Sequence, residues 1–126
     1  MPGPLDGLRV VEFTHLIQGP QCGALLQTLG AEVVKIEAPL LGDTSRRIPV
    51  APGDTRFPYL HAHNRGKRGV ALDIAAPEGL AVAKRLIERS DVLLATLRPG
   101  ALDRIGLDYD TCAELNPRLV YAIGST

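Results

Sequence analysis

Residues 9–37, RVVEFTHLIQGPQCGALLQTLGAEVVKIE, decide the fold of this chain. The apolar runs at 9–13 and 32–37 predict two strands and the segment between them predicts a helix, so the stretch forms a βαβ unit. In an open α/β sheet, ligands bind beyond the carboxyl ends of the strands and near helix N-termini. The turn at 14–20 is therefore the first candidate site. It contains no G-x-G-x-x-G motif of the kind that holds dinucleotides.

The rest of the chain continues the alternation of strands and helices. Further strands are predicted at three apolar runs, 69–72, 91–95 and 119–123. Pro77 begins a helix, and Asp108 caps another that extends to about residue 115. This order predicts one α/β domain over residues 1–126, with a doubly wound, mostly parallel sheet. Because the chain stops directly after a strand, without the helix that would cover it, we expect it to be the first part of a longer protein.

The segment 38–66 is predicted to be a long irregular loop. Prolines and glycines recur along it, and loops beyond about 15 residues are uncommon in compact domains. Long loops of this kind are usually functional or disordered. We expect this one to be ordered against another part of the molecule.

Composition excludes several classes of protein. The 14 Lys and Arg residues balance 14 Asp and Glu residues, which argues against a nucleic-acid surface. No apolar run reaches membrane-spanning length, and the first residues lack the pattern of a signal peptide, so we expect a cytoplasmic protein without membrane contact. Cys22 and Cys112 form no C-x-x-C motif, and Cys22 is expected to be a small buried residue of the first helix.

Polar residues after two of the strands are candidates for chemistry on position alone. His15 follows the first strand, where an imidazole donates to an anion, acts as an acid or base, or simply bonds to the backbone. Arg98 and Arg104 follow the strand at 91–95. They either meet an anionic ligand or form salt bridges with neighbouring aspartates.

Two further clusters stand at the end of the long loop. The basic residues 65, 67 and 68 form either a phosphate site or a solvated loop end, and charge alone favours the second. His61 and His63 lack a third ligand nearby, so we expect no metal site. No serine lies in a nucleophile elbow, and no phosphate-binding P-loop is present.

Short motifs run through the chain in a fixed order. They are PLDGLRV at 4–10, GP at 19–20, LGAEVVKIE at 29–37, GD at 42–43, N at 64 with KR at 67–68, ALD at 71–73, PEG at 77–79, DVL at 91–93, RPGALDRIGL at 98–107 and NPRLVY at 116–121. In this combination the chain resembles the family III CoA-transferases, the CaiB/BaiF superfamily, which includes formyl-CoA transferase and α-methylacyl-CoA racemase. The resemblance covers essentially all 126 residues.

The resemblance implies a Rossmann-like large domain, of which this chain is the first part, and an interlocked homodimer. The implied activity moves CoA between an acyl-CoA donor and a carboxylic acid acceptor through covalent catalysis, with no covalently bound cofactor. The family's nucleophile is an aspartate, and its segment is expected beyond Thr126. No catalytic residue is therefore assigned within this chain, which alone is expected to be inactive.

By the same resemblance, the chain supplies much of the CoA-binding wall. His15 and Gln18 are implied as neighbours of the nucleophile, and Arg104 as a contact of the CoA phosphates. The implied CoA contacts are His15, Ile17, Gln18, Leu72, Asp73, Ile74, Ala75, Thr96, Leu97, Arg98 and Arg104. A formyl-CoA substrate is not implied, because the chain departs from patterns seen in family members at Ile17, Ala38, Gly66, Ala75, Thr96 and Leu97.

Two alternatives stay open at this level. One is an acyl-CoA racemase or isomerase of the same superfamily, in which this region moves the proton α to the thioester carbonyl. The other is a non-catalytic module, truncated or split, that acts only in binding or assembly. The sequence determines neither the acyl group nor the acceptor.

Overall fold

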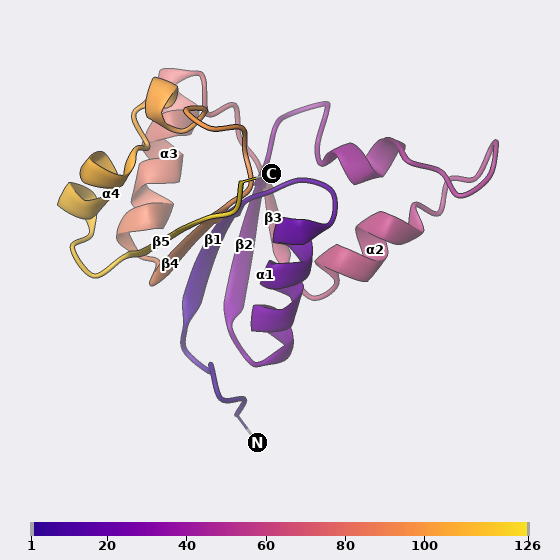
Figure 1. Ribbon diagram of the computed structural model, residues 1–126, viewed down its shortest axis with the longest axis horizontal. Coiled ribbons are helices and arrows are strands. Elements are labelled where there is room, and N and C mark those ends of the chain that lie inside the picture. Colours follow the sequence, from indigo (N-terminus) through magenta and orange to yellow (C-terminus); the bar gives the residue numbers. More distant parts are fainter. Residues whose placement is uncertain (1, 126) are drawn as a thin grey trace.

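The computed structural model describes residues 2–125. Parallel strands form one sheet in the order β3-β2-β1-β4-β5, and their bounds are β1 (Arg9–Phe13), β2 (Glu32–Glu37), β3 (Arg68–Ala71), β4 (Val92–Ala95) and β5 (Val120–Ile123). The chain begins in the middle of the sheet, moves outward through β2 and β3, and then crosses to the other side through β4 and β5 (Figure 1). This doubly wound α/β arrangement confirms the predicted fold class. It also places the carboxyl ends of all these strands along one edge, called here the carboxyl edge.

Helices cover both faces of the sheet. On one face lies α1 (Gln18–Thr28), with α2 (Pro58–Asn64) beside it, and on the other lie α3 (Pro77–Glu88) and α4 (Tyr109–Leu115) (Figure 1). Successive strand residues point to opposite faces, so each face has its own apolar core. The core under α1 contains Val10, Ala31, Val33 and Leu94, and the core under α3 and α4 contains Val11, Phe13, Ile36, Ala83, Ile87, Leu93, Ala95, Leu102, Leu107 and Cys112.

Polar side chains fix the ends of α3 and α4. The Asp108 side chain accepts a hydrogen bond from the Thr111 amide at 2.9 Å, as the sequence predicts for a helix cap. Beyond α4, the Asn116 side chain donates to the carbonyls of Ile87, at 3.1 Å, and Ser90, at 2.7 Å. Because these carbonyls lie at the end of α3, Asn116 joins the two helices.

Small residues form the most deeply buried part of the packing face of α1. Gly19, Pro20 and Gly23 are its buried residues. A Cβ atom added at Gly23 would lie 2.0 Å from Glu12 Oε2 on β1, so the helix approaches the strand more closely than a larger residue allows. Leu26 packs partly buried against the core under α1, whereas Leu25 is exposed and Cys22 is exposed as well. The prediction that Cys22 is buried is therefore wrong.

The segment 38–66 is more regular than predicted. It contains the short 3-10 helix η1 (Thr44–Arg47) and all of α2. Pro58 occupies the first turn of α2, and seven residues are too few to show helical periodicity in the sequence. Leu60 of α2 is buried, and the helix packs against α1 and η1. Among residues 2–125, no helix is both long and apolar enough to cross a membrane.

Candidate functional site

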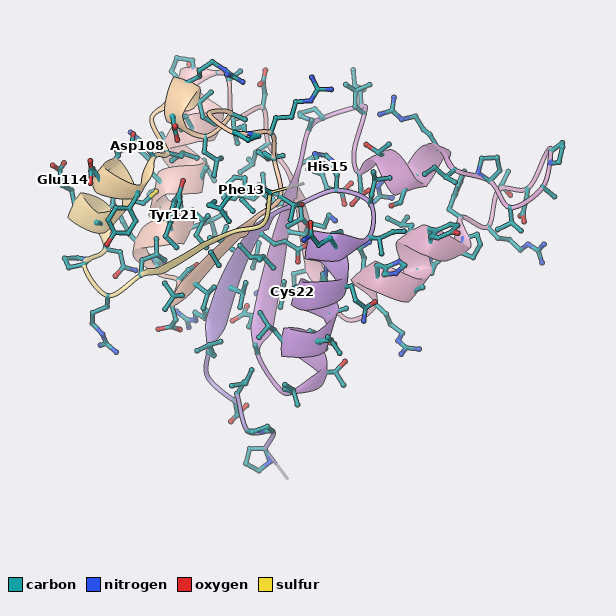
Figure 2. The ribbon with its side chains drawn as sticks, viewed as in Figure 1. Phe13, His15, Cys22, Asp108, Glu114 and Tyr121 are labelled. Carbon is teal, nitrogen blue, oxygen red and sulfur yellow. The ribbon has the colours of Figure 1, made fainter. Side chains whose placement is uncertain are left out.

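Residues that are distant in sequence meet at the carboxyl edge. His15 follows β1, residues 72–75 follow β3 and Leu97 follows β4. Together they border a cavity of about 170 Å³, the carboxyl-edge cavity, which is lined by Phe13, His15, Ile36, Ala38, Leu72, Asp73, Ile74, Ala75 and Leu97. Figure 2 shows Phe13 and His15 near each other at this end of the sheet. The structure thus brings together most of the residues that the sequence analysis places near CoA.

A second cavity adjoins the first, because Leu97 borders both. It has a volume of about 390 Å³ and lies between the end of β4, β5 and α4, with Arg98 and Tyr121 in its lining. The Tyr121 hydroxyl donates to the Leu107 carbonyl at 2.8 Å, and burial raises the pKa of this phenol to about 12. Arg104, on η2 (Asp103–Ile105), is exposed beside this cavity's rim, and its amide bonds to the carbonyl of Gly100, a lining residue.

Two polar atoms at this edge are buried without a hydrogen-bond partner within residues 2–125. They are His15 Nδ1 and Thr96 Oγ1. Such atoms are uncommon in folded proteins, and both lie where β1 and β4 end. Gln18 reaches the same place, since a Cβ added at Gly124 would lie 3.6 Å from its carboxamide and 3.1 Å from Thr96 Cγ2. Ile17, by contrast, lines neither of these cavities in the described chain and is 49% exposed.

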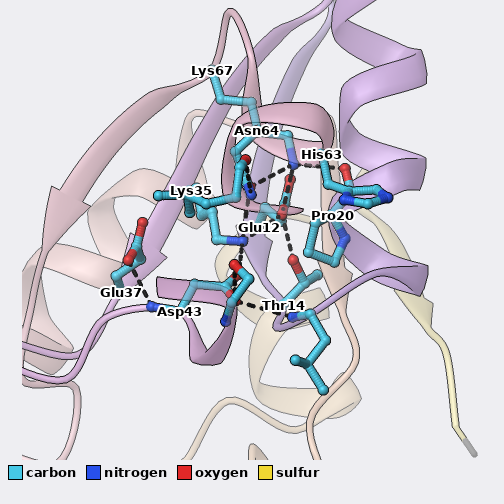
Figure 3. Close-up of polar contacts among 12 residues, drawn as sticks. Glu12, Thr14, Pro20, Lys35, Glu37, Asp43, His63, Asn64 and Lys67 are labelled. Atoms are coloured by element: carbon cyan, nitrogen blue, oxygen red, sulfur yellow. Dashed lines mark hydrogen bonds and ion pairs between the residues drawn. The ribbon is translucent and has the colours of Figure 1, made fainter. Parts of the chain in front are cut away.

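Four charged side chains form a buried ion cluster beside the turn at residues 14–18 (Figure 3). They are Glu12 on β1, Lys35 on β2, Asp43 after β2 and Lys67 before β3, and no more than 2% of any of these side chains is exposed. Lys35 Nζ pairs with Asp43 and lies 3.5 Å from Glu12, and Lys67 Nζ lies 2.8 Å from Glu12. The side-chain oxygen of Asn64 accepts from Lys35 at 2.9 Å and from Lys67 at 3.2 Å.

This cluster was not predicted, although the sequence contains a signal for it. Glu12 and Lys35 each interrupt an apolar strand in a sheet predicted to be covered on both faces, and the two residues are directly paired between β1 and β2. Lys67 was assigned to an exposed basic group, and this assignment is wrong. Its Nζ also donates to the Pro20 carbonyl of α1 at 2.7 Å, whereas its neighbour Arg68 is exposed.

Charge pairing outweighs burial at Asp43. Burial by itself raises the pKa of this carboxyl, but the Lys35 ammonium and the hydrogen bonds from Ser45 and Leu16 hold the pKa at about 2. At Lys67, burial lowers the pKa of the ammonium and the adjacent Glu12 partly offsets that effect. Asp43 is therefore ionised throughout the physiological pH range.

Other reactive side chains contribute less to this edge. Cys112 lies in the core under α4, where burial raises the pKa of its thiol to about 11 and so makes it inert. His61 and His63 lie on α2, and the His63 ring stacks on Tyr59 with 6.2 Å between the ring centroids. In the part of the chain that the structure describes, no group of three His, Cys, Asp or Glu residues is placed to hold a metal ion.

Known proteins resemble this chain in sequence and in fold. A family model described as CoA-transferase family III matches residues 5–126. The succinate–glutarate CoA-transferase of Agrobacterium fabrum is 39% identical over 124 residues, which cover 94% of this chain and 31% of that protein. The succinyl-CoA–L-malate CoA-transferase beta subunit of Chloroflexus aurantiacus is 44% identical over 119 residues, which cover 93% of this chain and 29% of that protein.

A solved structure resembles this chain in fold as well as in sequence. The orthorhombic crystal structure of Rv3272 from Mycobacterium tuberculosis matches with a TM-score of 0.92 and 39% identity, covering 99% of this chain and 35% of that chain. The present chain therefore spans about a third of the length of the relatives that it matches.

Proposed function

Because this chain belongs to CoA-transferase family III, we propose that it forms the CoA-holding part of an enzyme that moves CoA from an acyl-CoA to a carboxylic acid. The observation that carries the proposal is the carboxyl-edge cavity, where His15, Asp73 and Leu97 converge from three strand ends. Apolar hollows with a few convergent polar groups are typical of small-molecule sites, and at about 170 Å³ this one suits one part of a CoA molecule. In this proposal, residues 1–126 are the first part of the family's large domain.

The arginines at the same edge suit the charged end of CoA. A guanidinium binds phosphate oxygens through paired, charge-assisted hydrogen bonds. Arg98 lines the adjoining cavity and Arg104 is exposed beside it, so both are available to phosphates that extend out of the carboxyl-edge cavity. The thioester end of acyl-CoA then lies toward His15, in the turn before α1, and Gln18, the first residue of α1.

The proposed chemistry follows from a nucleophilic aspartate that the resemblance places beyond residue 126. Its carboxylate attacks the acyl-CoA carbonyl, the carbon–sulfur bond breaks, and an anhydride forms as CoA thiolate leaves. The thiolate then attacks the aspartyl carbonyl, which gives an aspartyl-CoA thioester and frees the donor acid. The acceptor carboxylate next attacks this thioester and expels the thiolate, which in turn attacks the acceptor carbonyl of the new anhydride, releasing the product acyl-CoA and restoring the aspartate. Splitting one exchange into such steps lowers the barrier of each. His15 and Gln18 orient the thioester in this scheme, and no covalently bound cofactor is needed.

Replacement of Arg104 tests the CoA assignment in the full-length protein. Loss of one charge-assisted phosphate contact is expected to weaken CoA binding by about tenfold. The dependence of affinity on salt concentration is expected to become shallower, because one charge pair is lost. Arg118→Ala is the matched control, since Arg118 is also exposed but precedes β5 at the opposite edge of the sheet. Equal CoA affinity in wild type and Arg104→Ala would refute the phosphate role.

Product analysis separates transfer from the two alternatives. The relatives named above are CoA-transferases, which favours transfer over isomerisation. Transfer requires a carboxylic acid acceptor, whereas an isomerase exchanges the α-proton of an acyl-CoA in deuterated water without one. A full-length protein that binds CoA and catalyses neither reaction would instead be a binding module.

We also propose a homodimer in the cytoplasm for the full-length protein. The support for the dimer is the family resemblance, and the described residues include exposed apolar side chains, such as Leu25 on α1 and Leu40 and Leu41 after β2, that are available to a second chain or to the rest of the protein. Light scattering is expected to give the mass of two chains, and the mass of one chain would contradict the dimer.

A further inference from the structure

The turn at residues 14–18 has a backbone shape that its own sequence does not favour. Leu16 has φ = 66°, in the left-handed region of backbone conformation that residues other than glycine, asparagine and aspartate rarely adopt. A conformation of this kind persists only when surrounding contacts hold it. The turn carries His15 and Gln18, so its shape decides where these side chains stand at the carboxyl edge.

One contact of this kind comes from Asp43 in the buried ion cluster. Asp43 Oδ1 accepts a hydrogen bond from the Leu16 amide at 3.1 Å, and it also accepts from the amide and the hydroxyl of Ser45, each at 2.8 Å. The other oxygen, Oδ2, pairs with Lys35. One carboxylate therefore connects the unfavourable turn to a central strand of the sheet.

Both oxygens of Asp43 act as acceptors, one for the Leu16 and Ser45 donors and the other for Lys35, and only a carboxylate provides two such acceptors. An asparagine of the same size has one acceptor oxygen and one amide donor. If the asparagine oxygen accepts from Lys35, its NH₂ group faces the amide donors of Leu16 and Ser45. In the flipped orientation the NH₂ group faces the Lys35 ammonium, so two donors face each other in either case. The geometry of the site thus requires the charge and symmetry of aspartate.

Stability alone gives a weak reason for burying such a pair. Apolar residues of similar volume are often as stabilising as a buried ion pair, or more so. Here the ions come from β1, β2 and two connecting segments, and Asn64 of α2 bonds both lysines. Such a network fixes the relative positions of its members, which is what a binding turn needs.

From these contacts we propose that Asp43 is a positioning residue, which holds the turn at residues 14–18 in the shape that presents His15 and Gln18 to acyl-CoA. The proposal rests on the proposed function for the substrate. The hydrogen bond itself can be tested without any activity.

The first experiment compares Asp43→Asn with wild type in the full-length protein. Misplacing a reacting group by about 1 Å costs on the order of 100-fold, so we expect kcat for acyl transfer to fall about 10- to 100-fold. KM for acyl-CoA is expected to change much less, because most of the CoA contacts lie on other loops. Amide hydrogen exchange in a peptide covering residues 14–18 is expected to accelerate.

Ser45→Ala is the matched control. It removes one of the donors to the same Asp43 oxygen and leaves the Leu16 amide in place. We expect kcat and exchange in the turn to stay within about twofold of wild type, as for changes that leave the reacting geometry intact. If Ser45→Ala and Asp43→Asn lower kcat equally, Asp43 is only a structural anchor of the segment after β2 and the proposal is wrong.

A second variant covers the case in which Asp43→Asn does not fold. Replacing the Leu16 amide by an ester, through nonsense suppression with the α-hydroxy acid, removes the one N–H donor and leaves the Asp43–Lys35 pair intact. The same fall in kcat and faster exchange in the peptide that contains residue 16 are expected. Unchanged kcat and exchange would overturn the proposal.

Rescue supplies the final check. Glycine adopts positive φ freely, so Leu16→Gly reduces the dependence of the turn on Asp43. Adding Leu16→Gly to Asp43→Asn is expected to recover part of the lost kcat, and no recovery would count against the positioning role. If wild type neither binds CoA nor transfers acyl groups, the proposed function fails, and the exchange measurements still decide whether Asp43 holds the turn.

Discussion

Gly23→Ala tests the close contact between α1 and the buried ion cluster, because two physical effects predict opposite signs. Gly23 lies inside α1, and helix propensity alone predicts that alanine stabilises the protein by about 1 kcal/mol. The structure predicts the reverse. The added Cβ would lie 2.0 Å from Glu12 Oε2 and 3.0 Å from Lys67 Nζ, so either α1 or the buried carboxylate must move.

The magnitude follows from what must move. Overpacking costs about 1–3 kcal/mol, and losing one partner of a buried ion pair costs about 3–5 kcal/mol. Shifting Glu12 away from Lys67 loses only part of the second amount, so after the gain in helix propensity we expect a net destabilisation of about 2 kcal/mol or more.

Urea denaturation of the variant and of wild type measures this difference, with the slope m checked for two-state behaviour. Gln21→Ala is the control, since Gln21 is exposed on the same helix and its replacement is expected to stay within about 0.5 kcal/mol of wild type. A Gly23→Ala protein as stable as wild type, or more stable, would refute the close approach of α1 to Glu12.

Three further predictions concern Asp43, the two cysteines and Asn116. The pKa of Asp43 lies at about 2, below its ordinary 3.8. Its contribution to the free energy of unfolding is therefore complete above pH 3.8 and is lost as the pH falls toward 2. Urea denaturation at several pH values checks this, and free energies of Asp43→Asn and wild type that fall in parallel over this window would contradict it. Cys22 is exposed and Cys112 is buried with a pKa of about 11, so mass spectrometry after brief iodoacetamide treatment of the native protein should find Cys22 alkylated well before Cys112; equal labelling would show that α4 is not packed as described. Asn116→Ala removes two hydrogen bonds to the end of α3 and is expected to lower the free energy of unfolding by about 1–3 kcal/mol, as judged by urea midpoints; an unchanged midpoint would count against this link.

The fold was accessible from the sequence because its signals are local and repeated. Each strand is a short apolar run. Pro77 and Asp108 mark the starts of two helices through local effects, namely the fixed φ of proline and the side-chain cap of aspartate. Parallel strands place the residues that follow them along one edge, so position alone indicated His15, Arg98 and Arg104. Residues 72–75 and Leu97, which line the carboxyl-edge cavity with His15, were expected there only from the family resemblance.

The errors occur where packing between distant segments decides the outcome. Gly23 packs α1 closely against Glu12, so neither exposed Leu25 nor exposed Cys22 followed from helical spacing. Lys67 belongs to a cluster whose other members lie on β1, β2 and the segment after β2. A lysine in a basic stretch gives no local sign of partners that are 55 positions away in sequence, as Glu12 is.

Hydrogen exchange of the full-length protein with and without CoA tests the central claim most directly, namely that the carboxyl edge of this sheet holds the CoA moiety. The account predicts that CoA slows exchange in peptides that cover residues 14–18, 72–76 and 96–104. Peptides at the opposite edge, such as residues 89–91 and 116–119, should exchange at unchanged rates. Protection confined to the opposite edge, or no protection in residues 1–126 at a saturating CoA concentration, would contradict the account.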